Sequence, residues 1–168
     1  MIIHCTQKLA KRLPGVSPNP LQETSPLGSW HGNLIHFDRR QCLFFCHDLS
    51  RAALFIPGVR KPELQQLGSE TFPVFLMEML RVLGCNRRQL QAVKLALGPV
   101  QFDTTTSRSV LASMNIAKFD LEPMVYDAAN VMDLDPVAAS VRITRRPATI
   151  SGKWIRPDEL LLSLVHAL

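Results

Sequence analysis

Two polar side chains on one predicted helix are the strongest candidates for a binding site. A helix that begins at Ser107 carries Arg108 and Asn115 seven residues apart, so both lie on one face, beside Ala112 and Phe119. An arginine and an asparagine among apolar neighbours are expected to be partly buried, and a buried polar group needs a partner. Two roles stay open. The pair could form a fork for an anion, a nucleotide or a partner's carboxylate, or it could tie the helix to a loop carbonyl.

A second candidate group opens the first strand of a predicted meander. Trp30 and Asn33 lie at its start, and Arg39 and Arg40 lie at its turn. An aromatic ring with nearby basic side chains can stack on a base and neutralise phosphates, which is how single-stranded nucleic acid is bound. The alternative is a Trp that closes the edge of the core.

Cysteines and histidines give no sign of a metal or catalytic centre. Cys42 and Cys46 lie four residues apart on one predicted strand, so both point to the same face, which favours two buried core residues over a zinc site. The five histidines are scattered, and no nucleophile elbow, zinc-protease, phosphate-loop or dinucleotide motif occurs. We therefore expect no metal, no cofactor and no catalytic residue, although a Cys–His pair that meets only in space stays open.

Size and charge indicate one globular domain over residues 1–168. The chain is 46% hydrophobic and 20% charged, which is typical of a folded protein, and its net charge of +5 is mildly basic. No apolar run could span a membrane, and no signal peptide opens the chain, so we expect a cytoplasmic protein with reduced thiols. Its charges separate along the chain into an acidic stretch and a basic C-terminal cluster: Asp120, Glu122, Asp127, Asp133 and Asp135, then Arg142, Arg145, Arg146, Lys153 and Arg156.

The pattern of elements predicts an α+β fold. Strands are expected at residues 1–5, 33–37, 41–46, 52–56 and 99–103. Helices are expected at residues 7–13, 71–83, 86–97, 107–122, 136–143 and 157–167, with a basic loop at 145–153. Because strands come early, helices come late and no regular βαβ alternation occurs, we expect an antiparallel sheet packed against several helices. In it the N-terminal strand joins a three-stranded meander and one later strand.

Three segments resemble a bacterial family of unknown function, domain of unknown function family 6933. They are the opening Met1-Ile2-Ile3-His4-Cys5-Thr6-Gln7-Lys8-Leu9, the segment Trp30-His31-Gly32-Asn33-Leu34 with Asp38-Arg39-Arg40, and Ser107-Arg108-Ser109-Val110-Leu111-Ala112-Ser113-Met114-Asn115. The resemblance covers about residues 1–125. It implies a small bacterial protein, in some longer chains joined to a domain found on plasmids. Relatives usually carry Asp after Asn115, where this chain has Ile116, and the resemblance transfers no catalytic residue.

The leading functional hypothesis is a non-enzymatic protein-binding or regulatory domain, associated with plasmids or mobile elements. It would act on another protein or by self-association, and not on a membrane. The first alternative is a nucleic-acid-binding protein that uses Arg39, Arg40 and the basic C-terminal cluster. The second alternative is a small-ligand or nucleotide-binding enzyme centred on Arg108 and Asn115.

Overall fold

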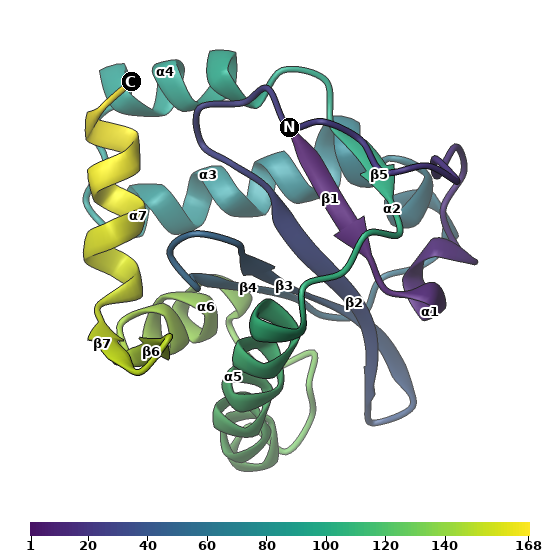
Figure 1. The fold of residues 1–168 in the computed structure, drawn as a ribbon. Coiled ribbons are helices and arrows are strands. Elements are labelled where there is room, and N and C mark those ends of the chain that lie inside the picture. The colour runs from purple at the N-terminus through teal and green to yellow at the C-terminus, as the bar shows by residue number, and fades with distance from the viewer.

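A five-stranded sheet forms the centre of the protein in a computed structural model that describes residues 1–168 (Figure 1). Its strands lie in the order β4-β3-β2-β1-β5. Their bounds are Ile2–Cys5 for β1, Trp30–Phe37 for β2, Arg40–His47 for β3, Ala53–Ile56 for β4 and Gln101–Asp103 for β5. The α+β class is thus confirmed, and each predicted strand forms.

The sheet is mixed, so the prediction of an antiparallel sheet is wrong for two of its four pairings. Only β2, β3 and β4 form the antiparallel meander, whereas β1 pairs in parallel with both β2 and β5. Parallel pairing of consecutive strands needs a connection of about a dozen residues or more. Residues 6–29, which hold the first helix and the proline-rich loop, supply that connection between β1 and β2.

Seven α-helices and one π-helical turn surround the sheet. Their bounds are Gln7–Ala10 for α1, Lys61–Gln65 for α2, Leu67–Thr71 for the turn η1, Phe72–Val82 for α3, Arg87–Leu97 for α4, Arg108–Asp127 for α5, Pro136–Thr144 for α6 and Pro157–His166 for α7. The expected capping box at Asn86 and Gln89 forms, with each side chain accepting the other's backbone N–H. Helix α1 is shorter than predicted, and α2 and η1 were not predicted.

Two further predictions about local structure are wrong. The basic segment 145–153 is not all loop, because β6 (Ala148–Ile150) and β7 (Lys153–Ile155) form a small antiparallel hairpin. Helix α5 also continues through Pro123 to Asp127. Pro123 is exposed, so water can reach the Phe119 carbonyl that loses its helical N–H partner there.

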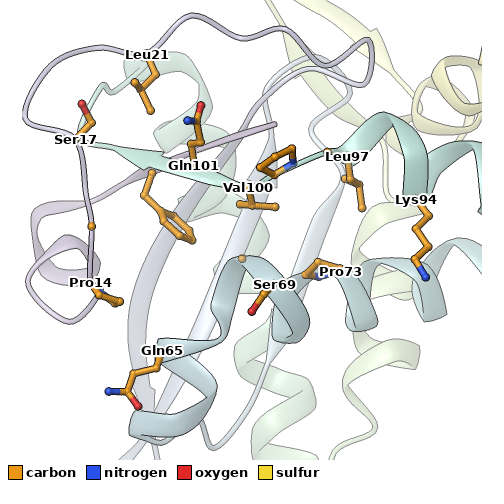
Figure 2. Close-up of a pocket in the computed structure, with 15 residues that line it drawn as sticks. Pro14, Ser17, Leu21, Gln65, Ser69, Pro73, Lys94, Leu97, Val100 and Gln101 are labelled. Atoms are coloured by element: carbon orange, nitrogen blue, oxygen red, sulfur yellow. The ribbon is translucent and has the colours of Figure 1, made fainter.

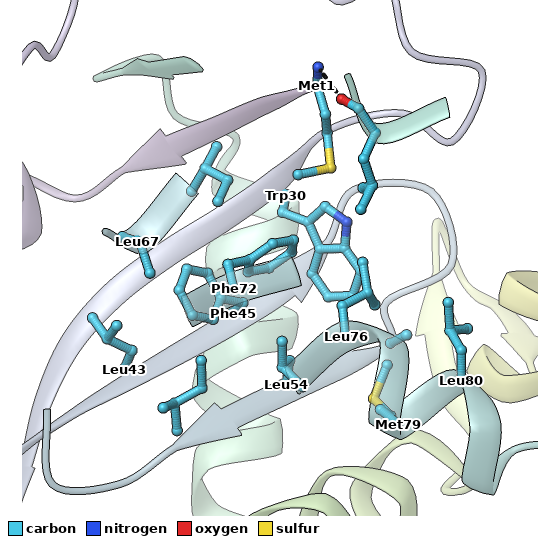
Figure 3. Packing of buried hydrophobic residues seen from close by; sticks show 14 of the residues in the cluster. Met1, Trp30, Leu43, Phe45, Leu54, Leu67, Phe72, Leu76, Met79 and Leu80 are labelled. Atoms are coloured by element: carbon cyan, nitrogen blue, oxygen red, sulfur yellow. Dashed lines mark hydrogen bonds between the residues drawn. The ribbon is translucent and has the colours of Figure 1, made fainter. Parts of the chain in front are cut away.

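Each face of the sheet has its own apolar core. One core gathers Trp30, Phe45 and Phe72 with side chains of α3, and all three rings are at most 1% exposed (Figure 3). The other core packs α5 and α6 against the opposite face, around Phe44 and Phe55. Because residues paired across the sheet point to the same face, this second face also carries the polar side chains of β1, β2 and β5.

Helix α6 also covers the free edge of β4. The Ser140 hydroxyl accepts the Phe55 N–H at 2.9 Å. The Thr144 hydroxyl accepts the Ala53 N–H and donates to the Ala53 carbonyl, both at 3.0 Å. An open strand edge is a template for pairing with another chain. These two buried hydroxyls occupy that edge.

Candidate functional site: the outer face of helix α5 and the polar cluster that holds it

Helix α5 is apolar on two opposite faces. Its inner stripe is formed by the predicted core positions Val110, Met114, Ala117 and Leu121, of which Ala117 is half-buried and the other three are at most 3% exposed. At 3.6 residues per turn a second apolar row lies opposite them. We call this row the outer stripe, and it consists of Ala112, Ile116, Phe119, Pro123 and Tyr126.

The outer stripe faces solvent along the whole helix. Ile116 is 63% exposed, Phe119 67% and Tyr126 86%, and no other element covers them. In Figure 1, α5 extends from the sheet to the lower edge of the molecule. Isolated exposed apolar side chains are normal, but a contiguous row on one face marks a contact surface. Trp154 of the β6–β7 hairpin, 78% exposed, lines a pocket together with Ile116 and so extends this surface.

Arg108 and Asn115 share a face of α5 as predicted, and that face is the outer one. Both side chains are exposed, and neither makes a hydrogen bond or an ion pair within the chain. The expectation that they are partly buried is therefore wrong, because the apolar neighbours Ala112 and Phe119 belong to the exposed stripe and not to the core. Their binding role stays a prediction, and they now flank the outer stripe.

The second candidate group is dispersed in space. Trp30 is 1% exposed and packs against Phe72 in the core, so no face of its ring is open. Asn33 is half-buried, and its Oδ1 accepts the Thr6 hydroxyl at 2.9 Å. Arg40 is exposed beside the two-residue turn of the β2–β3 hairpin, where Asp38 and Arg39 adopt φ angles of 47° and 61°. The structure therefore does not bring Trp30 and Arg40 together in one site.

A cluster of two histidines and two aspartates lies where β1, β2 and β5 meet, and sequence reasoning missed it. His4 Nδ1 is 2.6 Å from Asp103 Oδ1, and His31 Nδ1 is 2.7 Å from Asp48 Oδ1. The two imidazole rings have centroids 5.0 Å apart. Parallel pairing of β1 places His4 beside both His31 and Asp103. The only signal in the sequence is a polar residue at or next to the end of two short strands, His4 in β1 and Asp103 in β5.

This cluster fixes the start of α5. His31 Nε2 accepts the backbone N–H of Ser107, the N-cap of α5, at 2.8 Å. The other ring nitrogen of His31 must then carry its proton and donate to Asp48. A neutral histidine with a hydrogen bond at each ring nitrogen is a structural link between the sheet and the helix.

His4 has the geometry of a proton carrier but lacks a reactive neighbour. Its Nδ1 is held by Asp103, and its Nε2 lies 3.9 Å from Asp48 Oδ2. No hydroxyl or thiol is hydrogen-bonded to it. The adjacent Cys5 points into the core on the other face, where burial and the charge of Asp103 raise the thiol's pKa to about 12. Nucleophilic catalysis needs an activated nucleophile beside the base.

Asp103 organises the surroundings of the cluster. Its side chain is fully buried and accepts the N–H groups of Leu21 and Thr105 as well as His4. Burial by itself raises the pKa of a carboxyl group, but these hydrogen bonds together hold the pKa of Asp103 below its ordinary value. The carboxylate therefore stays charged and ties the loop before β2 to the end of β5.

A cavity of about 660 Å³ lies elsewhere in the molecule (Figure 2). It is bordered by the proline-rich loop, η1 and the segment that leads into β5. Lys94 is its only charged side chain, and much of its wall is proline and glycine. Its other polar side chains, Ser17, Gln65, Ser69 and Gln101, are uncharged. No group of three or more His, Cys, Asp or Glu side chains is placed to hold a metal ion, and no helix is both long and apolar enough to cross a membrane.

The structure thus defines an α+β protein with a mixed sheet between helical layers and an internal polar cluster that anchors an exposed apolar helix. The chain belongs to the family described as a domain of unknown function, DUF6933, whose sequence profile matches residues 2–160. This confirms the resemblance and extends it beyond residue 125. No curated protein is significantly similar to the chain.

Proposed function

We propose that the chain is a non-enzymatic protein-binding or regulatory domain that binds a second copy of itself through the outer stripe of α5. The observation that carries this proposal is the row of large apolar side chains exposed along one helix face. The second copy would pack antiparallel on the first, with Phe119 at the centre of the contact. Self-association was one of the two partner types expected from the sequence.

The exposed apolar area suits a weak, specific dimer. An aromatic side chain can bury roughly 150–250 Å². From their exposed fractions, Ile116, Phe119, Tyr126 and Trp154 together offer roughly 600 Å² on each copy. Stable interfaces bury about 1,200 Å² or more in total. Two copies therefore reach the lower end of that range, and we expect dissociation constants on the order of micromolar.

Charge favours an antiparallel second copy. The peptide dipoles of a helix place positive charge at its N-terminus and negative charge at its C-terminus. Helix α5 has Arg108 at its first position and Asp127 at its last, so each charge lies at the unfavourable end of its own helix. In an antiparallel pair, Arg108 would approach the partner's C-terminal end with its Asp127. Each of these charges, unfavourable at its own end of α5, would then be attracted to the opposite end of the partner's helix.

The sheet offers no competing surface for association. The edge of β4 is occupied by the hydroxyls of Ser140 and Thr144. The other edge strand, β5, is three residues long. Short or covered edges resist pairing with another chain. The outer stripe is consequently the surface on which we place the contact.

The test is the oligomeric state measured by sedimentation velocity between about 1 and 200 μM, around the expected micromolar constant. We expect a monomer–dimer equilibrium for the wild-type chain and a monomer for Phe119→Glu. The matched control is Leu95→Glu, which changes a side chain 74% exposed on α4 and should leave the dimer intact. A wild-type chain that is monomeric over the whole range would refute the proposal.

A charge exchange tests the orientation. Arg108→Glu and Asp127→Lys should each weaken the dimer, because each leaves like charges facing one another across it. The double variant restores opposite charges and should recover at least half of the lost affinity on a logarithmic scale. Independent losses that simply add would show that the two ends do not meet.

Nucleic-acid binding remains the alternative, and the ion pairs of the basic cluster weaken it. Arg146 is paired with Asp120, and Arg156 with Asp158, so only part of the C-terminal charge is free. Phosphate binding would show as a steep loss of affinity with salt. The cytoplasmic, bacterial and plasmid-associated setting expected from the sequence likewise stays a prediction.

A further inference from the structure

A second cavity, of about 290 Å³, lies between α5, the end of α6 and the β6–β7 hairpin. It shares Ile116 with the outer stripe and Trp154 with the surface that extends the stripe, whereas Phe119 does not line it. Arg51, from the turn that leads into β4, also borders this cavity. Three parts of the chain that are distant in sequence thus converge on one small hollow: Arg51, the middle of α5, and the segment from the end of α6 through the hairpin.

Arg51 is a buried cation without a counter-charge. The residue is 8% exposed, and no carboxylate lies within 4 Å of its guanidinium. Its Nη1 donates to the Asp48 carbonyl, and its Nη2 donates to the Ser109 hydroxyl at 3.1 Å. Nε is buried and makes no hydrogen bond. Since a guanidinium has five N–H groups, three are left without an acceptor in the chain.

The backbone holds Arg51 in an unusual conformation. Its φ angle is 63°, in the left-handed region that residues other than glycine rarely adopt. Burying an arginine at this position has two unfavourable contributions. One is the strain of its backbone conformation, and the other is the desolvation of a guanidinium that stays charged. A bound anion would compensate the second of these costs.

The other charged groups of the cavity neutralise one another. Asp120 and Arg146 both line it and form an ion pair with each other. The remaining charge of the site is therefore the single positive charge of Arg51. One guanidinium balances a monoanion, whereas a phosphate monoester carries nearly two negative charges at neutral pH. A carboxylate also matches the planar fork of a guanidinium in shape.

The walls define the rest of the ligand. Ile116, Ile143 and Pro147 supply apolar surface, and the exposed ring of Trp154 lies at the rim. A cavity of roughly 150 Å³ is enough for benzene, so this one has room for a ring and a carboxylate group. We propose that the cavity binds a small monocarboxylate with an aromatic or branched apolar body, its carboxylate on Arg51 and its body against Trp154.

The test uses benzoate and phenylacetate as probes on the full chain, with benzamide and phenylacetamide as uncharged matches, at constant ionic strength. Binding is followed by Trp fluorescence, to which exposed Trp154 responds while Trp30 stays buried in the core. We expect saturable binding of at least one acid, at least tenfold tighter than that of its amide. Equal affinity for acid and amide, or no saturation with either acid up to 10 mM, would overturn the proposal, as would displacement of the acid by an equal concentration of inorganic phosphate.

Variants locate the binding. Arg51→Met should abolish the preference for the acid, and Trp154→Ala should weaken binding as measured by calorimetry. If Arg51→Met does not fold, the comparison of acid and amide affinities on the wild-type chain still tests the carboxylate site. Phe119→Glu should bind the probes normally, because Phe119 is outside the cavity. Probe binding by this variant, which is expected to be monomeric, therefore tests the carboxylate site independently of the dimer.

Discussion

Acid should destabilise the fold through one histidine. His47 is fully buried, its Nε2 lies 2.7 Å from the Leu27 carbonyl, and its Nδ1 accepts the Ser50 N–H at 3.1 Å. The ring therefore has its proton on Nε2 and no room for a second one. Burial lowers the pKa of His47 from 6.5 to about 4, although the Leu27 carbonyl and nearby acids act against this. The folded state thus needs the neutral ring.

The size and direction of the effect follow from that shift. A folded-state pKa below the unfolded value means that the unfolded chain takes up a proton first as the pH falls. The stability supplied by neutral His47 is present above pH 6.5 and is lost progressively between pH 6.5 and about 4. At pH 4.5 the expected loss is roughly 2–3 kcal/mol of unfolding free energy relative to pH 8.

Urea unfolding at pH 8.0 and pH 4.5 measures this loss, and His47→Gln is the informative variant. Its side-chain amide can replace the donor to Leu27 but does not titrate. The variant is expected to be less stable at pH 8, since it loses the contact with the Trp30 ring, whose centroid is 4.9 Å from that of His47. It should nevertheless lose roughly 2–3 kcal/mol less than the wild type on acidification. Exposed His36→Gln is the control, and an equal acid loss in the wild type and His47→Gln would refute the reasoning.

Three other substitutions test the contacts that position α5 and the sheet. Gly32→Ala should lower the free energy of unfolding by about 2 kcal/mol, because its Cβ would lie 2.9 Å from Phe45 and 3.0 Å from Leu9. Thermal unfolding measures this change, and an unchanged melting temperature would contradict this packing. Asp103→Ala should cost about 3 kcal/mol, since it leaves four donors without their acceptor, and a loss below about 1 kcal/mol would argue against the hydrogen-bonded cluster. His31→Gln should weaken the proposed dimer several-fold by loosening the start of α5, which sedimentation would detect. An unchanged dimerisation constant would show that the polar cluster does not control the position of α5.

The sequence predicted local structure well because local structure depends on neighbouring residues. The inner stripe of α5 and the capping box at Asn86 each need only side chains within a few residues of one another. The strand directions depend instead on how the chain crosses between strands. Residues 6–29 were recognised as a helix and a loop, but nothing in their composition states that the loop carries β2 back parallel to β1.

The candidate site was less predictable because its partners meet only through folding. His4 and Asp103 are 99 residues apart and come together through the parallel pairing that the sequence did not indicate. The burial of Arg108 and Asn115 was misjudged for a different reason. Helix α5 is apolar on two faces, so apolar neighbours do not show which face is buried.

The polar cluster and the outer stripe form one arrangement. A helix packed only by its inner stripe could slide or tilt on the sheet, because dispersion contacts between apolar side chains have little directionality. The hydrogen bond from the Ser107 N–H to His31 and the bond from Arg51 to Ser109 fix the first turn of α5 relative to the sheet. The same turn carries Arg108 at the start of the outer stripe. Directional contacts at one end of the helix therefore hold an exposed apolar face in a defined position, which reduces the ordering cost of binding a partner there.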